Sequence, residues 1–240
     1  FQSDSQNSSS ARAMLTRGDF PGFYAPGVIV SRGLGHRLYD PVLQAEIENQ
    51  AWPDFKGHFL SSVYPPYVAA LLRPFAELPP LQAKAAATAL LLLAFAFTCT
   101  MLIQELQVPS PLRFPFVVFC ITLAPIFVSI LATQNTTISL LFFLMAILFT
   151  SKGTSRGDYQ AGISLGLWLF KPQFALLALA FPVVSGRYRI LLGALVPSVL
   201  YWLLGYTVLG AQWQSEWFTA ARTFGNENFL VNGFQMVSLA

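Results

Sequence analysis

The sequence predicts an all-α fold, a polytopic bundle of transmembrane helices, and three observations lead to this prediction. Charged residues make up only 10% of the 240 residues, far below the roughly 25% of soluble domains. Hydrophobic residues make up 55% of the chain. Long stretches between residues 85 and 210 carry no charge. These features exclude a soluble globular domain, and we expect lipid to be the solvent for most of the chain.

Several apolar segments are long enough to cross a bilayer. Residues 85–104 are uncharged, and their helix would cross a hydrocarbon core of roughly 30 Å. Residues 114–151 are also uncharged but too long for one span, and a polar break at residues 133–137 divides them into two helices and a tight turn. Residues 190–210 form a further apolar segment around Pro197, which membrane helices tolerate. We therefore expect at least four spans.

The first part of the chain differs in composition from the rest. Residues 1–66 hold six of the eleven acidic residues and many turn formers, so we expect a large polar loop there. Residues 67–240 form the expected transmembrane helical region, in which residues 224–228 begin another polar loop. The chain opens at Phe1 without a Met and stops at Ala240, so we expect a fragment that is truncated at both ends.

Lysine and arginine predict the orientation in the membrane. Residues 151–159 and 185–189 each carry two basic residues, whereas the turn at residues 133–137 carries none. Cytoplasmic loops are enriched in Lys and Arg, so the two basic segments should be cytoplasmic. Tracing the helices outward from them places the turn at 133–137 and the loop at 1–66 on the extracytoplasmic face.

A lysine interrupts one of the apolar segments. Residues 159–186 lie between the two basic loops and contain Lys171-Pro172-Gln173 near their centre, which predicts a pair of short or broken helices with Lys171 at the tip. A lysine in such a stretch is costly unless it faces water, a carboxylate or an anionic ligand. A functional role is therefore favoured over a lysine that merely reaches toward the membrane surface.

Residues 67–80 form a shorter apolar segment, too short to span comfortably. Arg73 and Glu77 are spaced i to i+4, so they would share one face of a helix. Two interpretations remain open: a helix in the membrane interface with a salt-linked polar face, or a partly inserted helix that offers Arg73 to a phosphate. A true span here would invert the topology of everything that follows.

Several kinds of site are excluded by the motifs that the sequence lacks. The net charge is +3, but no basic cluster with interleaved aromatic residues indicates nucleic-acid binding. No nucleotide fingerprint, P-loop, zinc-ligand spacing or Gly-x-Ser-x-Gly elbow occurs. Cys99 and Cys120 lie in apolar segments, where we interpret them as small buried hydrophobes. We assign no cofactor and no metal ligand.

Five short motifs in sequence order carry a family resemblance. They are Arg17-Gly18-Asp19-Phe20 with Tyr24, Leu38-Tyr39-Asp40-Pro41, Tyr64-Pro65-Pro66 leading into residues 71–79, Gln134-Asn135, and Lys171-Pro172-Gln173. Together they resemble the polyprenyl-phosphate-mannose-dependent α-1,2-mannosyltransferase-like group of the GT-C superfamily, glycosyltransferase family 87. The resemblance covers most of the chain. One residue departs from the pattern, since Thr133 stands before Gln134 where the family more often has Gly.

The resemblance implies a multi-pass enzyme of GT-C type in the bacterial cytoplasmic membrane, with its active site on the extracytoplasmic face. It would transfer a hexose, expected to be mannose, from a polyprenyl-phosphate donor to a lipid or cell-envelope glycan acceptor with inversion. The family's catalytic base maps onto Asp19. Lys171 or Arg73 would stabilise the departing phosphate. Four more candidates for sugar binding are Gln134, Asn135, Tyr24 and Tyr64, although Gln and Asn also cap helices and Tyr also anchors at interfaces.

Two other classes of protein remain as alternatives. A transporter or flippase-like protein for lipid-linked saccharides would use the same broken helix and lysine for substrate passage. A scaffold without turnover would tolerate replacement of both Asp19 and Lys171. The large acidic outer loop favours the enzyme.

Overall fold

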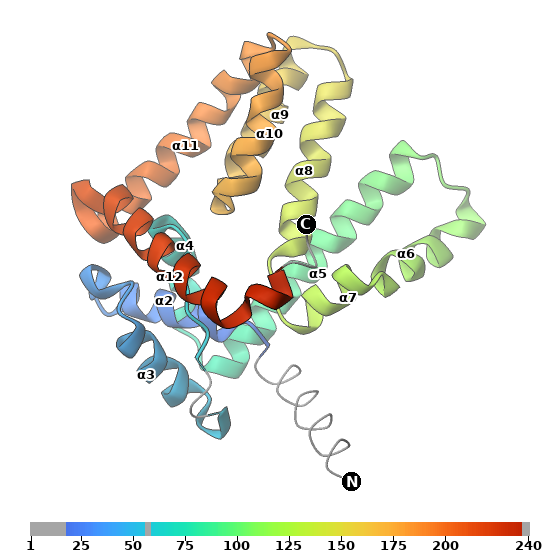
Figure 1. Ribbon diagram of the computed structural model, residues 1–240. Helices are drawn as coiled ribbons and strands as arrows, with labels where there is room; N and C mark the ends of the chain where they lie inside the picture. Colours follow the sequence, from blue (N-terminus) through green and yellow to red (C-terminus); the bar gives the residue numbers. More distant parts are fainter. Residues whose placement is uncertain (1–17, 56–58, 237–240) are drawn as a thin grey trace. The chain divides into compact units, whose positions relative to one another are not determined.

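In the computed structural model, residues 18–55 and 59–236 are described, and every regular element among them is a helix (Figure 1). The predicted all-α fold is thus confirmed for these residues. They belong to two compact units, of which the first combines residues 18–20 with 78–200 and the second combines residues 21–55 and 59–77 with 201–236. Arg17 of the first motif lies outside the described residues.

The first unit consists of apolar helices with short connections. It contains α5 (Pro80–Glu105), α6 (Arg113–Thr122), α7 (Ala124–Leu131), α8 (Thr136–Ser151), α9 (Ser155–Leu167), α10 (Pro172–Val184) and the beginning of α11 (Tyr188–Leu209), with 3-10 turns at Ser110–Leu112 and Trp168–Phe170. The second unit contains α2 (Pro21–Ser31), α3 (Pro41–Ala51), α4 (Pro66–Ala76), the end of α11 and α12 (Trp213–Met236), with 3-10 turns at Gly35–Arg37, Pro53–Phe55 and Gly210–Gln212.

Fewer helices can cross a membrane than the sequence predicts. Among the described residues, Pro80–Glu105 and the continuous stretch Tyr188–Gly225 are long and apolar enough, and the α6 and α7 pair counts as a third span if taken together. This pair is bent by 70°, whereas the sequence predicts one helix before residue 133. Pro125 explains the break, since proline fits the first turn of a helix but not its interior. With only 16 residues, α8 is short for a span.

The predicted break at Lys171 is confirmed. α9 ends at Leu167, a 3-10 turn follows, and Lys171 occupies the N-cap of α10 with Pro172 in the first helical turn. α9 and α10 lie side by side in Figure 1. At the other end of this pair, the Arg187 guanidinium donates to the Asp158 carboxylate and to the Thr150 carbonyl oxygen, which ties the two basic connections together.

The polar N-terminal region is more helical than the sequence predicts, because α2 and α3 occupy much of it. Whether it lies outside the membrane stays a prediction. Asp40 caps α3 by accepting the backbone N–H groups of Val42 and Leu43. The predicted loop at residues 224–228 is wrong, because α12 continues through them to Met236. Gly costs a helix only about 1 kcal/mol relative to Ala and Asn less, whereas Pro costs about 3 kcal/mol, and this stretch has no proline to end the helix.

Side-chain hydrogen bonds hold the extended segment before α4 against the rest of the second unit. The buried amide of Gln44 donates to the carbonyl oxygens of Leu38 and Ser62, and its oxygen accepts the Ser62 N–H at 3.0 Å. The Tyr39 hydroxyl donates to the Tyr64 carbonyl oxygen at 2.9 Å, and the Trp217 indole N–H donates to the Val63 carbonyl oxygen at 2.9 Å. These hydrogen bonds pair backbone N–H and carbonyl groups of residues 59–65, which belong to no helix or strand.

Candidate functional site

Two candidate residues from distant parts of the chain meet in the first unit. The backbone N–H of Asp19 donates to the Ala132 carbonyl oxygen at 2.8 Å. The side-chain amide of Gln134 donates to the Asp19 Oδ2 atom, across 115 positions of sequence. A carboxylate that accepts an amide donor, on a residue whose backbone is also hydrogen-bonded, has a fixed orientation. The Asp19 side chain remains partly exposed, so an incoming hydroxyl group has access to it.

Gly18 allows this close approach. A Cβ atom at Gly18 would lie 2.5 Å from the Ala132 carbonyl oxygen, a separation that real Cβ atoms do not show. Its φ of +56° is also in the left-handed region, which favours glycine. The glycine before the aspartate therefore has a physical reason: only a residue without a side chain lets the Asp19 backbone reach Ala132.

The turn that carries Gln134 is held rigidly between α7 and α8. The Gln134 N–H donates to the Ser129 carbonyl oxygen at 2.7 Å, and the Ser129 hydroxyl donates to the Gln134 carbonyl oxygen at 3.0 Å. The Thr133 hydroxyl lies 3.1 Å from that of Thr88 on α5. The Thr137 hydroxyl donates to the Leu91 carbonyl oxygen, also on α5, at 3.2 Å. The amide that orients Asp19 is thus fixed by its own backbone and by α5.

Thr133 adopts an unusual backbone conformation for its residue type. Its φ is +56°, a region in which a β-branched residue is strained and glycine is not. The departure from the family pattern therefore falls at a position whose conformation suits glycine. In this chain the hydrogen bond to Thr88 offsets part of that strain, and the turn keeps the shape that presents Gln134.

Asn135 occupies the N-cap position of α8, but its side chain makes no capping hydrogen bond. Its carbonyl oxygen accepts both the N–H and the hydroxyl of Ser139, each at 3.1 Å. Capping through the side chain therefore does not explain this asparagine. Gln134 is not explained by capping either, since its amide binds Asp19. A role in sugar binding stays a prediction for both.

Lys171 belongs to the same unit as Asp19, at the break between α9 and α10. Its side chain is half-buried. Its backbone is held on both sides, because its N–H donates to the Trp168 carbonyl oxygen and its own carbonyl oxygen accepts the N–H of Phe174 at 3.1 Å. The position is thus well defined, and a meeting of Lys171 with Asp19 around a substrate stays a prediction.

The other three candidates belong to the second unit. Arg73 is exposed on α4. Tyr24 is buried on α2, where its ring meets Trp52 edge-on at 5.5 Å and burial raises the pKa of its hydroxyl. Tyr64 is partly buried, with its ring 5.3 Å from that of Phe23. Packing against neighbouring aromatic rings therefore explains much of the placement of these two tyrosine side chains.

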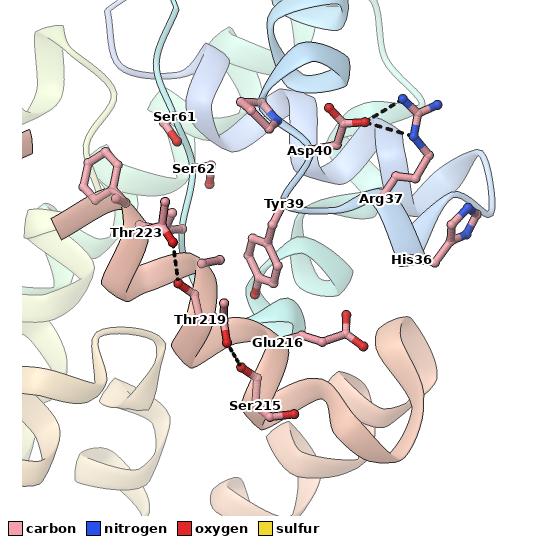
Figure 2. Close-up of a pocket in the computed structure, with 14 residues that line it drawn as sticks. His36, Arg37, Tyr39, Asp40, Ser61, Ser62, Ser215, Glu216, Thr219 and Thr223 are labelled. Atoms are coloured by element: carbon pink, nitrogen blue, oxygen red, sulfur yellow. Dashed lines mark hydrogen bonds and ion pairs between the residues drawn. The ribbon is translucent and has the colours of Figure 1, made fainter. Parts of the chain in front are cut away.

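The second unit also contains a pocket of about 630 Å³, shown in Figure 2. Hydroxyl groups and charged side chains line much of it. The labelled residues are His36, Arg37, Tyr39, Asp40, Ser61, Ser62, Ser215, Glu216, Thr219 and Thr223. The Arg37 guanidinium forms an ion pair with Asp40 at 2.6 Å, and its hydrogen bond holds the pKa of the Asp40 carboxyl below its usual value. Burial raises the pKa of the Tyr39 hydroxyl, which therefore stays protonated as a donor to Tyr64.

Sequence reasoning missed the contribution of α12 to this pocket, although a signal was present. Ser215, Thr219 and Thr223 are spaced four apart, and residues at i and i+4 share one face of a helix. These residues lie in the expected transmembrane helical region, just before the polar loop expected at residues 224–228, and a polar groove was not expected there. A hydroxyl at every fourth position of an expected helix would have indicated a polar groove.

At the junction of Asp19 and Gln134, a single carboxylate is oriented by an amide donor. Among the described residues, no group of three His, Cys, Asp or Glu side chains could hold a metal ion. A single oriented carboxylate can accept a proton from a hydroxyl group that lies within hydrogen-bonding reach. The arrangement therefore suits activation of a hydroxyl nucleophile.

Replacing Gln134 with Glu should change the pH dependence of the reaction. Two carboxylates side by side hold a proton more tightly than one, so the active, deprotonated form would appear only at higher pH. We expect the acid limb of the pH profile of kcat/KM to move to higher pH. Gln104→Glu, at an exposed position on α5, is the matched control and should leave the profile in place. An unshifted profile in Gln134→Glu would contradict a functional contact between residues 19 and 134.

Comparison with known proteins identifies a family. The model of the family described as Glycosyltransferase family 87 matches residues 63–239, which is more than half of the chain. The match includes Gln134 and Lys171, and Asp19 lies before its first residue. No curated protein and no solved structure matches the chain.

Proposed function

The chain belongs to glycosyltransferase family 87, and from that membership we propose that it transfers a hexose, mannose, from a polyprenyl-phosphate donor to a lipid or cell-envelope glycan acceptor. A glycosyltransferase uses a sugar donor and an acceptor, and helices apolar enough to cross a membrane make this one a membrane protein. A membrane location suits a donor with a long apolar chain. The proposed site is the extracytoplasmic face of the bacterial cytoplasmic membrane, since the basic connections at 151–159 and 185–189 are expected to be cytoplasmic.

One observation supports this proposal most strongly: the Asp19 backbone is bonded to Ala132, its carboxylate accepts the Gln134 amide, and its side chain remains partly exposed. In the proposed step, the acceptor hydroxyl gives its proton to Asp19 while its oxygen forms a bond to the anomeric carbon. The bond from that carbon to the phosphate oxygen breaks, and its electron pair leaves with polyprenyl phosphate. Attack opposite to the leaving group inverts the anomeric configuration. Phosphate is a good leaving group, so one base suffices.

The departing phosphate needs a cation. We assign this role to Lys171 or Arg73, because charge that develops on the leaving oxygen is stabilised best by a positioned cation. The half-buried position of Lys171 at a fixed helix break supports it over the exposed Arg73. Hydrogen bonds to sugar hydroxyls are assigned to Gln134, Asn135, Tyr24 and Tyr64.

Lys171→Ala should weaken use of the donor. Loss of a charge-assisted contact to a phosphate costs about 1.5–3 kcal/mol, so kcat/KM for the donor should fall roughly 10- to 100-fold. Lys171→Arg keeps the charge and should retain more activity than Lys171→Ala. Steady-state kinetics with varied donor checks this, with Lys152→Ala on an exposed connection as the control. Unchanged donor kinetics in Lys171→Ala would remove Lys171 from the site.

The proposed reaction is tested by following both products from a labelled donor. The full-length protein in proteoliposomes should release polyprenyl phosphate and form a glycosylated acceptor in equal amounts. A transporter or flippase would instead move the labelled donor across the bilayer without breaking its sugar-phosphate bond. Movement without cleavage would contradict the proposed function.

A further inference from the structure

We propose that the pocket of the second unit, which residues 36–41, residues 61–63 and α12 line, binds the neutral glycan part of the acceptor (Figure 2). This assignment rests on the proposed function, which requires an acceptor with a free hydroxyl. It adds a binding site for that acceptor, and none of the residues that line this site is Asp19, Gln134 or Lys171.

The size of the pocket suits an oligosaccharide of a few sugar units. Its volume of about 630 Å³ falls within the roughly 300–1,000 Å³ of pockets that bury small molecules. Its walls come from the segment before α4 and from α12, and Trp217 of α12 is bonded to Val63 of that segment at 2.9 Å. The two walls are therefore held together by a direct hydrogen bond, and the pocket is a defined feature of the second unit.

The hydrogen-bonding groups of the pocket match the hydroxyl groups of a sugar. The Ser215 hydroxyl donates to the Gln212 carbonyl oxygen of the preceding 3-10 turn at 2.8 Å. Within α12, the Thr219 hydroxyl donates to the Ser215 carbonyl oxygen at 2.8 Å and the Thr223 hydroxyl to that of Thr219 at 3.1 Å. A hydroxyl oxygen that has given its proton still has acceptor lone pairs, so these three offer acceptors to sugar hydroxyl protons. The Glu216 carboxylate, exposed beside them, offers two more acceptor atoms.

The charges of the pocket favour a neutral ligand over the anionic donor. Arg37 is already paired with Asp40 at 2.6 Å, so its positive charge is largely neutralised. Glu216 adds a negative charge that would repel a phosphate. Because the donor carries a phosphate and a neutral glycan does not, the pocket suits a glycan acceptor better than the donor.

A binding experiment without donor tests this assignment. The full-length Asp19→Asn variant, in detergent, is titrated with α-mannobiose as a neutral probe and with mannose 1-phosphate as an anionic one. We expect saturable binding of α-mannobiose and weaker binding of mannose 1-phosphate. Glu216→Gln and Thr219→Val should each weaken α-mannobiose binding about tenfold, as expected for loss of about 1.4 kcal/mol in polar contacts.

Thr207→Val is the matched control for Thr219→Val. The Thr207 hydroxyl also donates to its own helix, at 2.7 Å, but Thr207 does not line the pocket. It should leave α-mannobiose binding unchanged, and a thermal melt of each variant separates lost binding from lost folding. Equal binding in Glu216→Gln, Thr219→Val and the parent, preference for mannose 1-phosphate, or no binding of α-mannobiose by the parent would each overturn the proposal.

The outcome is independent of catalysis, because the titration contains no donor and no active base. If the transfer assay fails while pocket variants still weaken saccharide binding, the proposed reaction is wrong and the glycan site stands. If transfer occurs while pocket variants leave both saccharide binding and the KM for the acceptor unchanged, the glycan site is wrong and the reaction stands.

Discussion

Asp19→Asn is expected to lower the rate of sugar transfer about 10²- to 10⁴-fold, the usual contribution of a positioned general base. The asparagine side chain has the same shape and can still accept a hydrogen bond from Gln134, so the junction with the α7–α8 turn should persist. It cannot take the acceptor proton, and that is the function removed. Initial rates with a labelled polyprenyl-phosphate sugar measure the loss.

The melting temperature of Asp19→Asn should stay close to that of the parent, because its backbone bond to Ala132 is unaffected. Asp54→Asn is the matched control, since Asp54 is an exposed aspartate in the 3-10 turn Pro53–Phe55. It should transfer sugar at the parental rate. Full activity in Asp19→Asn would contradict the assignment of Asp19 as the base.

Gly18→Ala is expected to impair both stability and transfer. The left-handed conformation alone costs a non-glycine residue about 1–2 kcal/mol. The added Cβ would also press on the Ala132 carbonyl oxygen, 2.5 Å away, so the backbone must move and displace Asp19 from Gln134. A displacement of about 1 Å can cost 10²-fold in rate. Thermal melts and transfer rates of the same variant measure the two effects.

Gly33→Ala is the control that separates the cost of the left-handed conformation from the cost of the close contact with Ala132. Gly33 has a similar φ of +71°, but an added Cβ there meets nothing within 4 Å. It should show only the conformational cost and keep its transfer rate. If Gly18→Ala and Gly33→Ala had the same effects, the close approach of Gly18 to Ala132 would have no functional importance.

The long apolar helices could be predicted closely from the sequence. The predicted span at residues 85–104 corresponds to α5 (Pro80–Glu105), and that at 190–210 to α11 (Tyr188–Leu209). Membrane helices need a sustained run of apolar residues, and such a run is a local property of the sequence. The bend between α6 and α7 was missed although Pro125 is visible in the sequence, because the apolar run continues unbroken through it.

The site could be predicted only in its components. Asp19 and Gln134 were each candidates from family resemblance, but their hydrogen bond spans 115 positions and depends on how residues 18–20 meet the α7–α8 turn. No spacing rule reaches over that distance. The pocket beside α12 combines residues 36–41 and 61–63 with residues 215–224. Of these features, only the hydroxyl residues at 215, 219 and 223, spaced to share one helix face, could be recognised in the sequence.

A double-mutant cycle between Asp19 and Gln134 tests the central claim, that the amide acts on transfer by orienting the carboxylate. The kcat/KM of the parent, Gln134→Leu, Asp19→Asn and the double variant is measured in the labelled-donor assay. We expect Gln134→Leu alone to lower kcat/KM by about tenfold or more, and to cause a much smaller further loss in the Asp19→Asn background. The same factor in both backgrounds would show that the two residues act independently and would contradict the account.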